Sequence, residues 1–450
     1  MASPEPVQLL RLFQRVAPST FFDQICKEQE FHFRAGIYTL AVVVWLMICQ
    51  RLQTHGTLAA AVQWLLQGQA EDLLNGCKRV QEGQISPRTG GYCQARQKLP
   101  TLVVRQVTDR VIEQLRSEMQ EGWPGLNRPV VLIDGSTLQL PHSRTLLAAY
   151  PPGHNQHGAN HWPVMLIVVF HDVCSGLCLR PSWGPMYGPN AVSEQALAEH
   201  ALGRLPPEAV VLADCNFGIF AFAWAVKDSQ RDMILRLTKS RAQKILGRPL
   251  DLGTDQKLVW EASPWERQAH PRLPVPAAVH GRLVVCENPS RPQDPLYLFT
   301  TLDLPGDEIV RLYKLRWNIE TDLRSLKRTV GLHQLPGKGA AIVEKELLLA
   351  VTAYNLVRAV MCLAARRAEI TPRQLSFSFV QTAVEAALPT LCACSSQAEY
   401  TLQLDRLLYY AAQGKLPDRS RPRSYPRQVW GRGGHFPSRT SKPTIERLPK

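Results

Sequence analysis

The sequence predicts an α/β protein that combines a mixed sheet and flanking helices with a β-rich insertion and an N-terminal helical domain. A short, wholly apolar, β-branched run at 129–133 is typical of a buried strand. Strand and helix patterns alternate from there to residue 237, which favours helices packed on the faces of a sheet. Between 240 and 303 the helical periodicity is lost, and Pro-rich turns separate short extended runs.

The first 122 residues are expected to be mostly helical. Apolar residues recur there at helical spacing, and a Gly/Pro-rich break at 83–91 precedes the last of the segments. The predicted helices cover 31–52, 57–65, 70–81 and 92–120. We interpret this region as a DNA-binding helical domain, although no single helix carries a diagnostic recognition motif.

The α/β core follows in two pieces, 123–239 and 304–390, around the β-rich insertion at 240–303. Apolar and β-branched runs predict its strands, and amphipathic spacing predicts its helices. Besides 129–133, strands are expected at 164–170, 177–180, 209–213, 233–237, 257–260, 282–286 and 296–301. Helices are expected at 193–205, 217–227, 307–329, 342–367 and 373–388. The remaining residues, 391–450, form a C-terminal region that ends in a Pro- and Ser-rich basic tail from 415.

The net charge points to a polyanionic partner. Lys and Arg number 52 against 38 Asp and Glu, which gives a net charge of +14. Solubility alone is the alternative explanation, but it needs less charge of one sign. Nucleic acid is therefore the expected partner.

The chain is expected to be cytoplasmic and to contact no membrane. Its longest apolar run, 35–49, is shorter than the roughly 20 residues that span a bilayer, and no export signal precedes it. Eleven cysteines, spread singly, favour reduced thiols.

Two acidic residues directly follow apolar strands. Asp134 ends the run at 129–133, and Asp214 ends the run at 209–213. In open α/β sheets, ligands bind in the crevice beyond the strand ends, so the two carboxylates can converge. Taken alone, either residue is better explained as a turn or helix cap.

A third acid lies on the helix predicted at 307–329. Tyr313, Arg316, Glu320 and Lys327 fall within roughly 60° of one another on that helix, beside the apolar stripe that must face the core. An i,i+4 ion pair between Arg316 and Glu320 would account for those two residues but not for the tyrosine or the lysine.

Three carboxylates around one cleft suit Mg²⁺, with Mn²⁺ as a substitute. Two such ions can activate an attacking oxygen and stabilise the leaving one during phosphoryl transfer. Arg316 and Lys327 would bind phosphates beside the scissile bond, and Tyr313 would hydrogen-bond a backbone oxygen.

Two further residues beside the site have open interpretations. Trp317 can pack in the core or stack on an unpaired base. Glu194 reads as an acid in the first turn of a helix after Ser193, with support of the site as the alternative.

The spacing Tyr313-x2-Arg316-x3-Glu320-x6-Lys327 resembles the YREK signature of the insertion-sequence-four family of bacterial DDE transposases. Ile133-Asp-Gly-Ser136 resembles the first acidic block, and the segment 212–218 resembles the second. Segments 92–99 and 354–358 are also similar to the family, so the resemblance covers about residues 30 to 390. In one departure, Cys215 stands where an Arg often follows the second Asp in relatives.

This resemblance implies a ribonuclease-H-like core in which Asp134, Asp214 and Glu320 bind the metal ions. It further implies cut-and-paste transposition by strand cleavage, hairpin formation and strand transfer. The partners would be the terminal inverted repeats of the element, the target DNA and a second copy of the chain. Two alternatives stay open: a DNA-binding protein that has lost catalysis, and a nuclease of the same fold that cuts without joining.

Overall fold

The structure is a computed structural model, and its described residues are 17–31, 36–54, 56–68, 73–74, 77–119, 122–155, 158–288, 294–394 and 396–417. The described residues up to Lys415 belong to one compact unit. The basic tail predicted from 415 lies almost entirely outside the described residues. The division of the chain into four parts stays a prediction.

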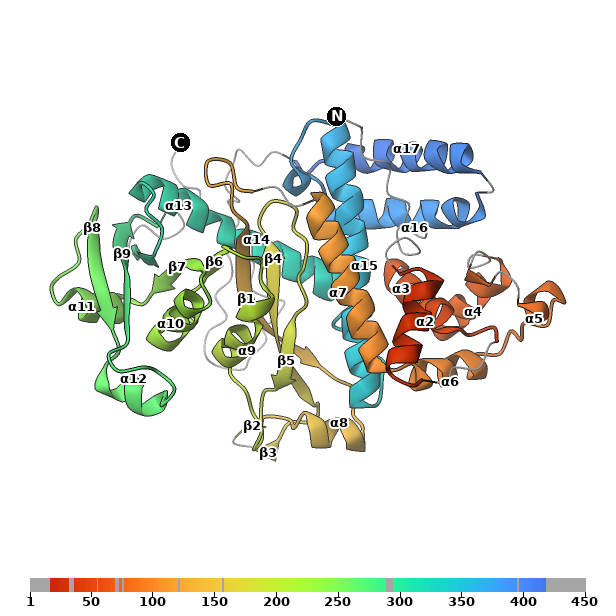
Figure 1. The fold of residues 1–450 in the computed structure, drawn as a ribbon, viewed down its shortest axis with the longest axis horizontal. Coiled ribbons are helices and arrows are strands. Elements are labelled where there is room, and N and C mark those ends of the chain that lie inside the picture. Colours follow the sequence, from red (N-terminus) through yellow and green to blue (C-terminus); the bar gives the residue numbers. More distant parts are fainter. Residues whose placement is uncertain are drawn as a thin grey trace, which may run out of the picture. The chain divides into compact units, whose positions relative to one another are not determined.

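An eight-stranded mixed sheet forms the middle of this unit, in the order β5-β4-β1-β6-β7-β10-β9-β8 (Figure 1). Its strands are β1 Val130–Gln139, β4 Val164–Asp172, β5 Ser182–Pro185, β6 Val210–Ala213, β7 Asp232–Leu237, β8 Asp255–Glu261, β9 Ala278–Cys286 and β10 Leu296–Thr300. β1, β6 and β7 run parallel, whereas β4 is antiparallel to β1 and β10 is antiparallel to β7. The predicted α/β class with a mixed sheet is confirmed.

The strand predicted at 177–180 is wrong. Only one isolated bridge forms there, between His171 and Cys178, and the strand that pairs with β4 is β5. Two backbone hydrogen bonds flank this bridge, from Asp172 N–H to the Leu177 carbonyl at 2.9 Å and from Leu179 N–H to the Phe170 carbonyl at 2.8 Å. On the other edge, the Asn355 side chain accepts from the backbone N–H of Cys178 at 2.8 Å and donates to the Cys178 carbonyl at 2.7 Å. The backbone groups of Cys178 that point away from β4 are thus satisfied by a side chain and not by a further strand.

The strands of the β-rich insertion extend the main sheet, because β10 pairs with β7 along its length. The expectation that 240–303 holds no helix is wrong. Two short helices lie in or at the start of this segment, α11 Lys239–Leu246 and α12 Pro264–Ala269. Each begins at a side-chain cap, and Ser263 with Glu266 forms a capping box at α12. Helices this short leave little periodicity to detect.

The N-terminal region is helical as predicted, with different boundaries. Its helices are α2 Ser19–Glu28, α3 Leu40–Leu52, α4 Leu58–Leu66, α5 Lys78–Gln81, α6 Gly90–Lys98 and α7 Thr101–Met119. The first predicted helix begins nine residues later, at Leu40 against the predicted 31, because Thr39 caps α3 by accepting from Val42 N–H. The last predicted helix is divided between α6 and α7, with Pro100 at the break. Part of the helix predicted at 70–81 lies outside the described residues.

Of the remaining helices, some pack on the sheet and others on one another in a helical half. They are α8 Arg144–Ala149, α9 Glu194–Ala201, α10 Phe220–Asp228, α13 Gly306–Lys314, α14 Asn318–Arg324, α15 Ala340–Arg367, α16 Phe377–Ala393 and α17 Gln397–Gln413. The helix predicted at 307–329 is present but changes its winding. A 3₁₀ turn at Leu315–Trp317 joins α13 to α14, and a π-helical turn at Ser325–Thr329 follows α14.

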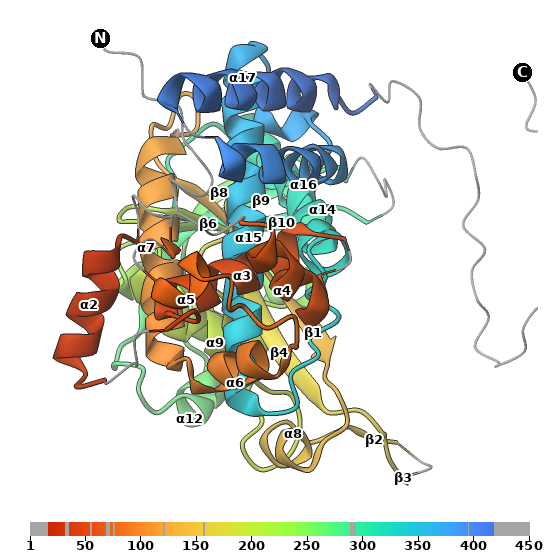
Figure 2. The same cartoon turned by 90° about the vertical axis from the view of Figure 1, so that its right-hand side faces the viewer.

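Helix α15 is the central helix of the helical half. It packs against α7, α3 and α17, and Figure 2 shows it running between the N-terminal and C-terminal helices. Among the described residues it alone is long and apolar enough to cross a membrane, but 94% of its apolar window is buried inside the protein. Burial by other helices accounts for this composition, as in any core helix.

Candidate active site

Strand pairing brings Asp134 and Asp214 to neighbouring positions. Leu132 of β1 is the partner of Leu212 of β6 in a parallel ladder, and each Asp lies two residues further along the chain, Asp134 within β1 and Asp214 directly after β6. The two side chains therefore leave adjacent strands at the same level of the sheet. Asp134 is not at the end of its strand as expected, because β1 continues to Gln139 and pairs with β4 over this stretch.

Electrostatics confirm that the two carboxylates are close. Burial raises the pKa of Asp134 from 3.8 to about 6, and the charge of Asp214 is the next largest cause, whereas Arg316 acts in the opposite direction. Two acids held together in a partly buried position repel each other unless a cation lies between them. Carboxylate oxygens are also the ligands that Mg²⁺ prefers, so the donor set fits a hard divalent ion.

The residues of the predicted polar stripe lie beside this pair. Arg316 forms an ion pair with Glu320 at 3.8 Å, and the Glu320 side chain is 44% exposed. Lys327 reaches β1, where its Nζ donates to Ser136 Oγ at 3.0 Å and to the Thr137 carbonyl at 2.9 Å. The helix that follows Lys314 thus lies against the strand that carries Asp134.

Glu320 approaches the two aspartates through Arg316. The Arg316 guanidinium pairs with Glu320, and its charge partly offsets the rise in the pKa of Asp134. Within the described part of the chain, no group of three or more His, Cys, Asp or Glu side chains is close enough to hold a metal ion. The structure therefore brings Asp134, Asp214 and Arg316 together and leaves Glu320 one ion pair away from them.

The aromatic residues of the stripe differ sharply in exposure. Tyr313 is buried, and its hydroxyl has no hydrogen-bond partner among the residues that the structure describes. Burial raises the pKa of Tyr313, and the charges of Arg316 and Arg236 oppose this rise. Trp317 is 56% exposed and lies beside the Arg316 guanidinium, 5.8 Å from its ring centroid. Core packing, one of the two readings of Trp317, is excluded.

Sequence reasoning missed the contacts made by the start of α9. Ser193 caps this helix, as expected, by accepting from Ala196 N–H at 3.1 Å. The Glu194 carboxylate lies over Gly135, where a Cβ atom would come within 2.1 Å of Glu194 Cδ. Asn216, two residues after Asp214, donates its side-chain amide to Glu194. Asn216 could not be identified from the sequence, because it lies in a loop where no helical or strand spacing marks it.

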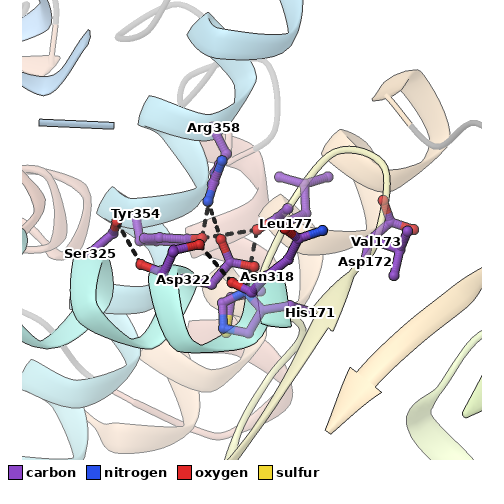
Figure 3. A network of polar contacts seen from close by, with 12 residues as sticks. His171, Asp172, Val173, Leu177, Asn318, Asp322, Ser325, Tyr354 and Arg358 are labelled. Atoms are coloured by element: carbon purple, nitrogen blue, oxygen red, sulfur yellow. Dashed lines mark hydrogen bonds and ion pairs between the residues drawn. The ribbon is translucent and has the colours of Figure 1, made fainter. Parts of the chain in front are cut away.

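A buried ion network anchors the helix of Glu320 from the far side (Figure 3). The carboxylate of Asp322 is fully buried and pairs with Arg358 of α15 and with Arg373, whose Nη1 lies 2.6 Å from Oδ1. Burial by itself raises the pKa of Asp322, but the neighbouring cations outweigh it and lower the pKa. This network fixes α14 to α15 and to the segment that carries Arg373.

A second buried pair ties the N-terminal helices to α15. Lys345 Nζ donates to the carbonyls of Arg96 at 2.7 Å and Leu99 at 2.9 Å, at the C-terminal end of α6. Burial lowers the pKa of Lys345 to about 8. The adjacent Glu346 accepts from Arg96 and from Gly337 N–H, the latter at 3.0 Å. These contacts hold the segment 92–99, which resembles the family in sequence, against α15.

Comparison with known proteins gives concordant results. The family model described as "Transposase DDE domain" matches residues 125–356, a range that contains Asp134, Asp214 and Glu320. The chain is 29% identical over 359 residues to "Transposase InsG for insertion sequence element IS4" of Escherichia coli (strain K12), covering 78% of each chain.

Among solved structures, a chain of the piggyBac transposase synaptic complex with hairpin DNA matches 90% of this chain and 86% of its own length. The TM-score is 0.44 and the sequence identity is 12%, which is below the level at which a shared fold can be argued.

Proposed function

Since the chain belongs to the family of transposases with a DDE domain, of the insertion-sequence kind represented by IS4, we propose that it performs cut-and-paste transposition with Asp134, Asp214 and Glu320 as its catalytic carboxylates. The observation that carries this proposal is the pairing of Leu132 with Leu212, which sets the two aspartates side by side on β1 and β6.

The chain's own residues suggest a division of labour. Asp134 and Asp214 would hold divalent ions, Mg²⁺ or Mn²⁺, and Glu320 would complete the set once Arg316 turns toward a DNA phosphate. When bound, such ions activate the attacking oxygen and stabilise the leaving one. Arg316 would offer a bidentate contact to a phosphate and Lys327 a point charge, while Tyr313 would donate to a backbone oxygen.

The strand order supports a ribonuclease-H-like core. In the series β5-β4-β1-β6-β7, three antiparallel strands are followed by two that run parallel to β1. This places both aspartates on central strands and leaves the Glu320 helix free to pack across them. We infer that this half of the sheet is the catalytic core.

The partners follow from the same premise. The element's terminal inverted repeats and the target DNA would be bound as double strands, in a synaptic complex of two copies of the chain in the bacterial cytoplasm. The helical region 1–122 would contribute DNA contacts. Trp317, exposed beside Arg316, would stack on an unpaired base at a hairpin end.

A cleavage assay tests the proposal. Purified protein is incubated with DNA carrying the ends of its own element and Mg²⁺, and the products are resolved on a denaturing gel. We expect nicks and hairpins from the wild type, none from Asp134→Ala, and none from Glu320→Gln despite retained DNA binding. Binding without cleavage, in Mn²⁺ as well, would favour a DNA-binding protein that has lost catalysis, and cleavage without strand transfer would favour a nuclease.

A further inference from the structure

The N-terminal end of α9 contacts both segments that carry the catalytic aspartates. Toward β1, Glu194 lies against Gly135, the residue after Asp134, so closely that a Cβ atom at this position would displace the Glu194 carboxylate. Toward the loop after β6, Glu194 accepts a hydrogen bond from Asn216 Nδ2. The Glu194 carboxylate thus contacts both the residue after Asp134 and the residue two positions after Asp214.

The side chain of Asn216 is exposed, but both its amide nitrogen and its amide oxygen are hydrogen-bonded by α9. Gln195 Nε2 donates to Asn216 Oδ1 at 2.9 Å and to the Asn216 carbonyl at 2.7 Å. The backbone N–H of Asn216 donates to Asp214 Oδ1 at 2.9 Å. The orientation of the Asp214 carboxylate therefore depends on Asn216, which in turn is fixed by two consecutive residues of α9.

Capping of the helix does not explain Glu194. Ser193 already accepts from Ala196 N–H, so the cap is provided by another side chain. An acid in the first turn gains at most about 1 kcal/mol from the helix dipole on an exposed surface, and any solvated orientation of the side chain would provide it. Instead the carboxylate points toward two other acids, an arrangement that costs free energy through repulsion.

We propose that Glu194 and Asn216 are positioning residues, which hold the Asp214 loop against β1 so that Asp214 and Asp134 present their oxygens to the same ion. This inference rests on the proposed function of the two aspartates. Outer-shell partners of metal-binding carboxylates commonly orient them, and their loss typically costs 10- to 100-fold in metal affinity or activity.

Two substitutions separate position from charge. Glu194→Ala removes both the contact on Gly135 and the acceptor for Asn216. Glu194→Gln keeps the shape and an amide oxygen that accepts from Asn216, but it removes the negative charge. Glu199→Ala is the matched control, because Glu199 is exposed on the same helix.

The readouts are Mn²⁺ affinity, measured by calorimetry on the full chain without DNA, and kcat and KM for cleavage of the element's end DNA. We expect Glu194→Ala and Asn216→Ala to weaken Mn²⁺ binding and lower kcat by 10- to 100-fold with little change in KM. Glu194→Gln is expected to restore most of both quantities, and Glu199→Ala to match the wild type. Thermal unfolding confirms that each variant is folded.

Either of two results would overturn the inference. Unchanged Mn²⁺ affinity and kcat in Glu194→Ala would show that α9 does not position the site. Equal losses in Glu194→Gln and Glu194→Ala would show that the charge itself is required, as for a direct ligand. The wild type is an independent check, since its failure to bind Mn²⁺ or to cut DNA would refute the proposed function instead.

Discussion

Asp134 is the residue at which folding and the proposed catalytic role oppose each other most directly. Its carboxylate is buried beside Asp214, and its pKa is raised to about 6. A group whose pKa is higher in the folded state than in the unfolded chain stabilises the fold only while it is protonated. At neutral pH without metal, the ionised carboxylate therefore weakens the fold, which is the usual cost of a site prepared for a cation.

We predict that Asp134→Asn stabilises the metal-free protein at pH 8. The pKa shift from 3.8 to about 6 corresponds to a gain on the order of 3 kcal/mol in the free energy of unfolding. The gain shrinks as the pH falls through 6 and nearly vanishes near 4, where the wild-type carboxyl is protonated in the folded state. Urea unfolding in EDTA across this range measures it. A difference independent of pH would contradict the assignment.

Gly135 gives a second prediction at the same scale. A Cβ at this position would lie 2.1 Å from Glu194 Cδ, so Gly135→Ala must displace the Glu194 side chain. Because the displaced atoms are the end of a flexible side chain, we expect slower cleavage with a loss of less than about 1 kcal/mol in stability. Gly203→Ala is the control, because no atom lies within 4 Å of a Cβ built there. Equal unfolding temperatures and cleavage rates for the two variants would refute the close approach.

At the scale of elements, the segment from α13 to the π-helical turn decides where the catalytic groups point. Its residues follow one helical path, yet the winding tightens at Leu315–Trp317 and loosens at Ser325–Thr329. The anchor is Asp322, two residues after Glu320 and on the buried side of α14. Glu320 thus belongs to a helix that a buried ion network holds in place.

Asp322→Asn should therefore destabilise the protein strongly. The change leaves Arg358 and Arg373 buried without their carboxylate, and breaking a buried ion pair costs about 3–5 kcal/mol. Arg367→Met is the comparison, since its pair with Asp405 is exposed and is worth no more than about 1 kcal/mol. Chemical denaturation of both variants gives the two values, and similar losses would argue against the network.

The sequence was most informative for elements with a strong period or a wholly apolar run. The strand at 129–133, the strand at 209–213 and the apolar stripe of the Glu320 helix were all predicted correctly. The strand predicted at 177–180 was wrong because its pairing with β4 is limited to one bridge and two flanking backbone hydrogen bonds, and regular pairing resumes only at β5. The short helices α11 and α12 depend on their caps, which a search for periodicity does not detect.

The candidate site was predictable only in part for a similar reason. The YREK spacing and the two strand-borne acids are visible in the sequence. The approach of α9 to Gly135 depends on how the helix packs, and no local pattern records it.

At the scale of the whole molecule, charge and connectivity complement each other. The chain carries a net charge of +14, and ten Lys and Arg against two acids lie between 415 and 450. Helix α15 joins the site to the N-terminal helices through Lys345 and Glu346 on one side and Arg358 on the other. The N-terminal helices and the helix of Glu320 are therefore connected through a single helix.

Replacing five of the Arg residues between 418 and 450 with Gln should weaken binding to DNA of any sequence. Each lost phosphate contact lowers the slope of log affinity against log salt by about 0.9. Filter binding or fluorescence anisotropy between low and physiological salt measures the slope. A slope equal to that of the wild type would show that the tail makes no phosphate contacts.

The pairing of β10 with β7 sets a limit on engineering this enzyme. Trimming or exchanging residues 240–303 would remove β10 and expose the backbone donors and acceptors along one edge of β7. Such an edge recruits other chains and leads to aggregation. Minimised versions of the protein must therefore keep β10 or supply another strand in its place.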